Sequence, residues 1–375
     1  MFESVPLWMM VAGFLLMLGP LVTLHELGHY LVGRWFGVKA EVFSVGFGKE
    51  IAGRTDSRGT RWRLSMLPLG GYVQFKGDMN PASQPSEQWL AMPRAEREQC
   101  FQARKLWQKA LIVAAGPVTN LLIAIAIFAA FALAYGKPAD NPVESLTISE
   151  FAEQSAGRDA GLQEGDRILA IDGRRVASHA EVIERVVLYP GKTIELAIER
   201  DGQTLAVPLT VGNSLETDRF GNEMRAGRIG VIFDAPPLVP VGPIEAIGIG
   251  LDQTRASLSM MVTGIVQIVV GDRSVKELGG PLTMAKYSGE QLSLGPQEFV
   301  WFVAFISINL AFINLLPIPA LDGGHLAFYA AEAVRRKPAS PRSQEWAFRT
   351  GMAFVLALML FVTAIDIAKL PIFGS

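Results

Sequence analysis

The chain has 375 residues, of which 50% are hydrophobic and 19% are charged, whereas an ordinary soluble domain is roughly 25% charged. Its 34 Lys and Arg residues nearly balance 36 Asp and Glu residues, for a formal net charge of -2. This balance argues against a nucleic-acid binder, because such proteins carry a basic domain. The single cysteine, Cys100, excludes an intrachain disulfide and a cysteine-rich zinc site. Any histidine metal site must use His25, His29, His179 or His325.

Apolar residues gather in four stretches that approach the roughly 20 residues needed to cross the hydrocarbon core of a bilayer. These stretches are 5–32, 106–135, 299–321 and 348–368. The first has no basic segment at its start and carries histidines deep within it, so we interpret it as a permanent span and not as a cleaved signal peptide. A fifth stretch, 244–270, contains Glu245, Asp252 and Arg255, which favour an amphipathic helix at the membrane interface.

The distribution of Lys and Arg predicts how these spans are oriented. Residues 1–33 contain neither type, whereas residues 34–105 contain twelve. The connection after the third span is also basic, with Arg335, Arg336, Lys337 and Arg342. We therefore expect both connections to be cytoplasmic. Both termini and the long segment between the second and third spans then lie outside, which in a bacterium is the periplasm.

The segment 137–235 is soluble in character. Residues 179–188 have a helical pattern, and two strand-like runs, 193–202 and 203–211, meet at the hairpin signal Asp201-Gly202. Short strands with a single helix predict a small, partly open barrel in this segment.

A second group of strands is expected in the first basic connection. The pieces 40–53 and 60–77 are strand-like, and apolar and polar residues alternate over 42–45 and 61–67. The pair Gly70-Gly71 is expected to break the second run and to permit a close backbone approach. These strands follow the first span directly, so they predict a short sheet that dips into the membrane beside that span.

Residues 25–29 read His-Glu-Leu-Gly-His, inside the first span. Helix positions four apart differ by about 40° and lie about 6 Å apart, so His25 and His29 can bind one metal ion. Glu26 is turned by about 100° from His25 and can reach a water molecule without becoming a ligand, which is the logic of the H-E-x-x-H motif. Two histidines and a carboxylate without partners would be costly in lipid, which favours a metal site.

A catalytic zinc site takes three protein ligands and leaves one position for water. His179 falls in the outer domain and cannot reach the pair in the first span. The other candidates lie at the end of the third span, where Pro317 and Pro319 break the helix. Irregular backbone at membrane depth is tolerated where it lines a cavity. Asp322 and His325 can both bind a metal, and spacing does not choose between them.

Five stretches occur in the order found in the site-2 proteases, a family of intramembrane zinc metalloproteases. They are HELGH at 25–29, PLGGYV at 68–73, AAGPVTN at 114–120, AGLQEGDRILAIDG at 160–173 and NLLPIPALDGGH at 314–325. The chain resembles the bacterial branch of the family, the regulator of sigma-E proteases, over nearly its whole length. The fourth stretch is similar to a PDZ domain, which binds an extended peptide at a sheet edge; the alternative is a spacer that only restricts access. The best-known members of this branch carry two tandem PDZ domains, and this chain has room for one.

The resemblance implies specific roles. His25, His29 and Asp322 would bind Zn²⁺, and Glu26 would activate the water. His325 would be an interfacial residue or would support the ligands. Asn314 and Pro317 would lie near the substrate backbone, and the strand at 64–69 would hold the substrate extended. The substrate-contacting residues of that strand region would be Leu64, Met66, Leu67, Gly70 and Gly71.

The predicted function is that of an intramembrane zinc metalloprotease acting on pre-trimmed single-pass membrane proteins, such as anti-sigma factors or signal-peptide remnants, after a site-1 protease. The predicted location is the bacterial inner membrane, with the active site toward the cytoplasm. One alternative is a non-enzymatic scaffold that binds peptides through its PDZ domain and holds a structural zinc with His325 as fourth ligand; the intact Glu26 argues against it. Another is a metal transporter, but we find no inverted repeat.

The predicted fold is a multi-span α-helical membrane protein with four transmembrane helices, a small membrane-associated β region and a periplasmic α+β PDZ domain. The expected order begins with the first span (1–36), the cytoplasmic loop with β strands (37–105), the second span (106–136) and the PDZ-like domain (137–235). Amphipathic linker helices (236–296), the third span with the Leu-Asp-Gly motif (297–334), a cytoplasmic loop (335–347) and the fourth span with the C-terminus (348–375) follow.

Overall fold

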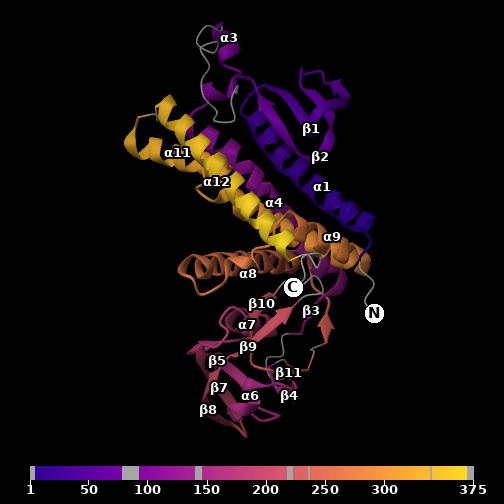
Figure 1. Ribbon diagram of the computed structural model, residues 1–375, viewed down its shortest axis with the longest axis vertical. Coiled ribbons are helices and arrows are strands. Elements are labelled where there is room, and N and C mark those ends of the chain that lie inside the picture. The colour runs from indigo at the N-terminus through magenta and orange to yellow at the C-terminus, as the bar shows by residue number, and fades with distance from the viewer. Residues whose placement is uncertain are drawn as a thin grey trace. The chain divides into compact units, whose positions relative to one another are not determined.

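The computed structural model describes residues 5–77, 93–139, 146–217, 223–234, 237–337 and 340–369, and Figure 1 shows the course of the chain. The chain divides into two compact units. One comprises Met1–Ile127 and Gly279–Ile367, and the other comprises Phe128–Leu278 and Ala368–Ser375. The first unit holds both metal-site motifs, and the second holds the predicted outer domain.

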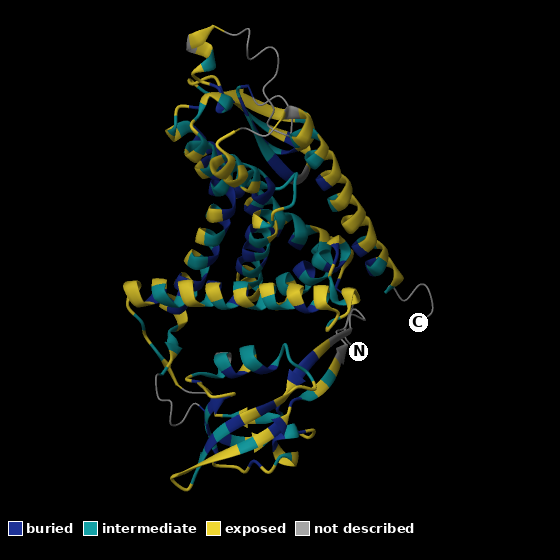
Figure 2. Cartoon of the chain, turned by 90° about the vertical axis from the view of Figure 1, so that its left-hand side faces the viewer, coloured by how far each residue is buried: buried dark blue, intermediate teal, exposed yellow. Residues whose placement is uncertain are grey.

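Four helices in the described part of the chain are long and apolar enough to cross a membrane. They are α1 (Leu7–Trp35), α4 (Leu106–Tyr135), α10 (Pro296–Leu315) and α12 (Pro341–Ala368). The four predicted spans are therefore confirmed as helices. Figure 2 shows exposed residues along the sides of the long helices, and apolar residues such as Leu16, Leu122 and Leu360 are among them. Exposed leucines on a long helix suit contact with lipid chains.

The predicted break at the end of the third span is confirmed, because α10 ends at Leu315 and a separate helix, α11 (Asp322–Arg335), follows. Pro317 and Pro319 lack the N–H groups that would continue the helix, which explains the interruption. The residues 335–347 were expected to form a loop, but α12 begins at Pro341, because proline is well suited to the first turn of a helix.

The first unit also contains the predicted sheet, formed by β1 (Ala40–Thr55) and β2 (Arg61–Phe75). Val42 pairs with both Arg61 and Gln74, so the first half of β1 lies between the two ends of β2. The expected break at Gly70-Gly71 was wrong, because β2 continues through both residues. Gly70 has a φ of +140°, and register shifts accompany it, so the strand bends there instead of ending.

The helix α9 (Pro281–Leu294) packs against α1 in the same unit, as Figure 1 also shows. A Cβ atom on Gly13 of α1 would lie 2.6 Å from the backbone oxygen of Ser288, and one on Gly289 would lie 2.7 Å from Cα of Met10. These two glycines therefore let the backbones of the two helices touch. The predicted linker 236–296 is thus divided, since α9 belongs to the first unit.

Strands of the second unit form a four-stranded antiparallel sheet in the order β6-β5-β7-β8. The predicted hairpin is confirmed, because β7 (Thr193–Arg200) and β8 (Gln203–Thr210) pair along their length. Asp201 and Gly202 both have positive φ, 51° and 76°, as a two-residue hairpin turn of this kind requires. The predicted helix is present as α7 (His179–Val186). Buried apolar side chains such as Ile168, Leu196 and Leu209 form the core.

The remaining elements of the second unit are short apart from α8 (Pro243–Val270), the helix predicted at the interface. They are β3 (Lys137–Pro138), β4 (Ile148–Phe151), α6 (Ala156–Asp159), β5 (Arg167–Ile171), β6 (Arg174–Arg175), β9 (Gly212–Thr217), β10 (Glu223–Arg228), β11 (Val231–Phe233), β12 (Leu238–Val239) and the 3₁₀ turn η2 (Val275–Glu277). In the first unit, α3 (Arg94–Arg97) and the 3₁₀ turn η1 (Phe101–Ala103) precede α4. The resemblance of 137–235 to a PDZ domain stays a prediction.

Candidate metal centre

Two histidines of α1 form one side of the candidate metal centre. His25 and His29 are one helical turn apart, and both are buried. Their Nε2 atoms lie 3.2 Å apart, and the rings meet edge to face with centroids 4.8 Å apart. The two imidazoles therefore point at one place, as their spacing on a helix predicted.

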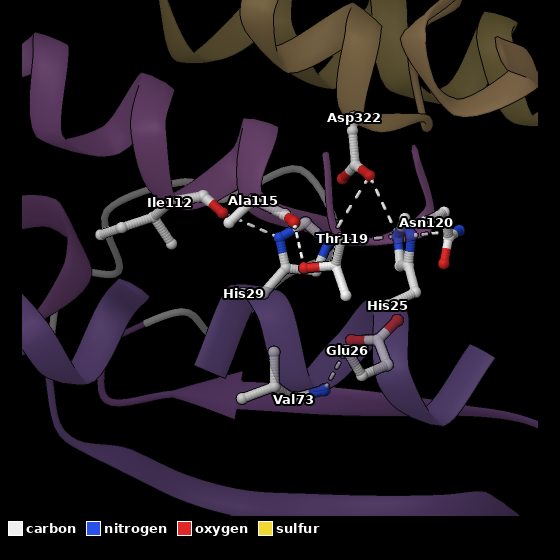
Figure 3. A network of polar contacts seen from close by, with 9 residues as sticks. All are labelled: His25, Glu26, His29, Val73, Ile112, Ala115, Thr119, Asn120 and Asp322. Atoms are coloured by element: carbon white, nitrogen blue, oxygen red, sulfur yellow. Dashed lines mark hydrogen bonds and ion pairs between the residues drawn. The ribbon is translucent and has the colours of Figure 1, made fainter. Parts of the chain in front are cut away.

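A carboxylate from a distant part of the chain completes this group. Oδ2 of Asp322 lies 3.2 Å from Nε2 of His25 and 3.5 Å from Nε2 of His29. Asp322 is the first residue of α11, directly after the break that follows α10. Ala320, within that break, has a φ of +87°, a backbone conformation that costs about 1–3 kcal/mol for a residue with a side chain. The strained turn aims Asp322 at the histidines (Figure 3).

The three groups fit a zinc ion. Their ligand atoms lie within 4.8 Å of one another, and two nitrogens with one carboxylate oxygen match the three protein ligands of a catalytic zinc site. Oδ2 of Asp322 is buried and accepts no hydrogen bond from any residue that the structure describes, although it lies close to both imidazoles. A buried carboxylate oxygen that accepts no hydrogen bond is costly unless a cation balances it.

Room for an ion beside the imidazoles depends on Gly116 of α4. A Cβ atom built on Gly116 would lie 2.2 Å from Nε2 of His29 and 2.7 Å from Nε2 of His25. Both distances are shorter than non-bonded atoms tolerate. Glycine is therefore required where α4 passes the two ligand atoms.

The outer nitrogens of both rings contact α4. Nδ1 of His29 lies 2.8 Å from the backbone oxygen of Ile112, and Nδ1 of His25 lies 3.1 Å from the side-chain amide of Asn120. A histidine that binds a metal through one nitrogen usually has the other held by a hydrogen bond. Both Nε2 atoms thus remain directed toward Asp322, as Figure 3 shows.

Glu26 stands beside this group without joining it. Its Oε2 accepts a hydrogen bond of 3.1 Å from the backbone N–H of Val73 in β2. Glu26 lines a cavity of about 330 Å³ together with the two histidines and Asp322. The carboxylate is therefore close enough to act on a water molecule in the cavity while the three other groups bind a metal.

The predicted substrate residues divide into two sets. Asn314 lines the cavity, and so does His325. Leu64, Met66 and Leu67 are exposed on the hairpin, and Gly70 and Gly71 lie on its bent strand. Neither these five nor Pro317, in the break after α10, is among the described residues that line the cavity. His179 is stacked on Phe233 in the second unit and takes no part in the cluster, as predicted.

Sequence reasoning missed two of the four residues around the histidines, Ile112 and Val73. It interpreted Gly116 as a small residue that permits close helix packing, and it favoured structural support for Asn120 over a hydrogen bond to the active-site helices. Ile112, Gly116 and Asn120 recur at intervals of four on α4 and face the rings, and Val73 holds Glu26 through its backbone. The spacing of the first three is a helical signal that was available in the sequence. The role of Val73 was not available, because a backbone N–H leaves no mark on residue type.

This site has the groups of a zinc metalloprotease. These are two histidines one helical turn apart, a carboxylate as the third ligand, and a neighbouring glutamate. The sequence profile of Peptidase family M50 matches residues 13–358, and the chain belongs to this family, which comprises the site-2 proteases. It is a zinc metalloprotease and, with four helices able to span a bilayer, a membrane protein.

Similar proteins support the same class. Atu1380 of Agrobacterium fabrum, which is named as a zinc metalloprotease, is 41% identical over 365 residues and 96% of each chain. The metalloprotease MmpA of Caulobacter vibrioides is 33% identical over 392 residues, which cover 97% of this chain and 96% of MmpA. The PDZ domain of the SdrC-like protein of Listeria monocytogenes aligns with 24% of this chain and 87% of its own at 18% identity. Its TM-score of 0.20 is too low to establish a shared fold.

Proposed function

We propose that this protease hydrolyses peptide bonds within transmembrane segments of membrane proteins that another protease has already shortened. The observation that carries the proposal is the position of the cluster. His25, His29 and Asp322 lie on or next to helices that are apolar enough to span a membrane, and they share a cavity with Glu26. A protease built this way would receive its substrate from the bilayer.

The residues of the cavity divide the chemistry among them. His25, His29 and Asp322 would hold a zinc ion, which supplies a Lewis acid for the scissile carbonyl. Glu26 would take a proton from the attacking water and return it to the nitrogen of the leaving amine. Asn314 and His325 line the same cavity, where they can donate to or accept from the peptide backbone of the substrate.

A transmembrane substrate must lose its helical hydrogen bonds before it can be cut. The edge of β2 offers replacement bonds, since an extended peptide can add to a free strand edge. Leu64, Met66 and Leu67 on the hairpin expose apolar surface against which such a peptide could lie. Substrates with helix-weakening residues near the cleaved bond should therefore be cut faster than matched leucine-rich substrates.

The proposed substrates are single-pass proteins of the anti-sigma factor type and remnants of signal peptides, each released first by a site-1 protease. The proposed location is the bacterial inner membrane. The basic residues of 34–105 and 335–342 support a cytoplasmic position for these two segments, with the active site toward the cytoplasm. The termini and the PDZ-like domain would then be periplasmic, where the domain would bind peptides or limit access by size.

The test is cleavage of a transmembrane-helix reporter in detergent by the wild type and by Glu26→Gln, with the zinc content of both measured. We expect the wild type to cut a pre-trimmed reporter and Glu26→Gln to keep about one zinc ion while losing at least about 1,000-fold in rate. Glu50→Gln, on the exposed hairpin, is the matched control and should cut normally. A wild type that holds zinc and cuts soluble peptides but no transmembrane reporter would contradict the proposal.

A further inference from the structure

The helix α4 presents three residues at intervals of four to the histidine pair. Ile112 contacts His29, Gly116 passes beside Nε2 of both rings, and Asn120 contacts His25. Residues four apart lie on one face of a helix. This face therefore meets both imidazoles at once and is placed to control which nitrogen of each ring carries a proton.

For His29 the backbone alone decides. The oxygen of Ile112 can only accept a hydrogen bond, so Nδ1 of His29, 2.8 Å away, must be the donor. In a neutral imidazole the other nitrogen then carries the lone pair. Nε2 of His29 is thus ready to bind a metal.

For His25 no backbone oxygen of a residue that the structure describes plays this part. Among the described residues, the amide nitrogen Nδ2 of Asn120 lies 3.1 Å from Nδ1 of His25, and Oδ1 of Asn120 is buried without a hydrogen-bond partner. The two ends of an amide are nearly the same size, so the hydrogen-bond network decides which end faces the ring. An NH₂ group facing Nδ1 would leave the proton on Nε2 and block the ligand atom. An oxygen facing Nδ1 would accept its proton and leave the lone pair on Nε2.

We propose that Asn120 is a positioning residue whose Oδ1 accepts the Nδ1 proton of His25 and thereby holds Nε2 of His25 in the metal-binding form. The proposal rests on the ligand role of His25 in the proposed function. It exchanges the oxygen and nitrogen of the Asn120 amide relative to the structure, since only Oδ1 facing Nδ1 of His25 leaves both Nε2 atoms able to bind a metal.

The surroundings keep Asn120 in place. Its side chain is fully buried, and its backbone oxygen accepts a hydrogen bond of 2.8 Å from the hydroxyl of Ser307 in α10. The amide therefore cannot turn out to water. A neutral amide also suits the site, because Glu26 and Asp322 already supply two carboxylates to the cavity that the rings line. It orients His25 without adding a third buried negative charge.

The experiment measures zinc affinity by competition with a chelator for the wild type, Asn120→Leu and Asn120→Asp. Asn120→Leu keeps the approximate size but removes the acceptor, and we expect zinc affinity to fall by about 10–100-fold. Asn120→Asp keeps an acceptor, so its affinity should stay within about threefold of the wild type or rise. The absorption spectrum of the cobalt-substituted protein should change in Asn120→Leu and be preserved in Asn120→Asp.

Ser307→Ala is the matched control, because it removes the hydrogen bond to the backbone of Asn120 and leaves the amide in place. It should bind zinc as the wild type does. The proposal is overturned if Asn120→Leu binds zinc within about twofold of the wild type, if Asn120→Asp is as weak as Asn120→Leu, or if Ser307→Ala is equally weak.

The same measurements keep the two proposals apart. If the wild type binds zinc and cuts reporters, and Asn120→Leu binds zinc equally well, then only the proposed role of Asn120 is wrong. If Asn120→Leu loses zinc but the wild type cuts no transmembrane reporter, the role of Asn120 is supported and the proposed substrate is contradicted.

Discussion

The backbone N–H of Val73 in β2 donates a hydrogen bond to Oε2 of Glu26 in α1, at 3.1 Å. This N–H points away from β1, so the edge of β2 that faces the cavity is the one in contact with the proposed general base. A substrate strand that adds to this edge would therefore arrive beside Glu26. The same contact holds the carboxylate in one position before substrate binds.

Val73→Pro tests this contact, because proline lacks the N–H and is tolerated at a strand edge. We expect kcat for a transmembrane reporter to fall by about 10-fold or more, since Glu26 loses the group that orients it, while zinc content stays at the wild-type level. Val73→Ala keeps the N–H and should retain most of the activity. Equal losses in both variants would show that the side chain matters and the N–H does not.

Gly116→Ala should abolish zinc binding. The added Cβ would lie 2.2 Å from Nε2 of His29, in the space between the ligand atoms and α4. The helix backbone that carries it and the imidazole ring that it meets are both buried, so neither can easily move away. Zinc content after purification should fall below about one tenth of the wild-type value, because the methyl group takes the space of the ion itself. Gly19→Ala in α1 meets no atom within 4 Å and should bind zinc normally. A zinc-replete Gly116→Ala would contradict this account of the site.

Much of the fold was predictable because its signals are local. The four long helices and the Asp201-Gly202 hairpin each depend on residues adjacent in sequence. The H-E-x-x-H pair belongs to the same class, because helix geometry alone brings His25 and His29 together. What failed were boundaries that depend on neighbours, such as the start of α12 at Pro341 and the continuation of β2 through Gly70.

The third ligand shows where sequence reasoning stops. Residue type and spacing left Asp322 and His325 equal, and only the turn around Ala320 directs Asp322 to the two imidazoles. The family resemblance had implied the same residue. Asn120 was expected to give structural support, and the contact with Nδ1 of His25 came only from the packing of α4 on α1.

Asp366, near the end of α12, is buried and holds the start of α9. Its carboxylate accepts hydrogen bonds from the backbone N–H groups of Gly280 and Thr283 and from the hydroxyl of Thr283. A negative charge at a helix N-terminus is favourable. The contact ties α12 to α9, which packs on the helix that carries His25 and His29.

Asp366→Ala should lower the free energy of unfolding by about 2–4 kcal/mol, because it leaves three buried donors without an acceptor. Thr283→Ala removes one of the three bonds and should cost about 1 kcal/mol. Denaturant unfolding in detergent and amide exchange of α9 would measure both. If α9 loses no more amide protection in Asp366→Ala than in Thr283→Ala, the carboxylate of Asp366 does not hold this helix.

In the second unit, Asp166 links the turn before β5 to the end of β7. Burial alone would raise the pKa of Asp166. Its carboxylate, however, accepts two hydrogen bonds of 2.7 Å from the guanidinium of Arg200 and one from the N–H of Gln163. These contacts outweigh burial and hold the pKa of Asp166 below its ordinary value. A carboxyl group with a lowered pKa in the folded state contributes stability above its unfolded pKa of about 3.9. That contribution is lost as the pH falls through the lower, folded pKa.

We therefore expect amide protection in β5 and β7 of the full chain to be higher in the wild type than in Asp166→Asn at neutral pH. The difference should shrink as the pH falls below about 4, because the unfolded chain then binds a proton that the folded Asp166 resists. Asp172→Asn is the matched control, since Asp172 is exposed and asparagine tolerates its positive φ. Asp172→Asn should leave the pH profile unchanged. A constant difference between the wild type and Asp166→Asn from neutral pH to pH 2 would mean that Asp166 acts through shape alone.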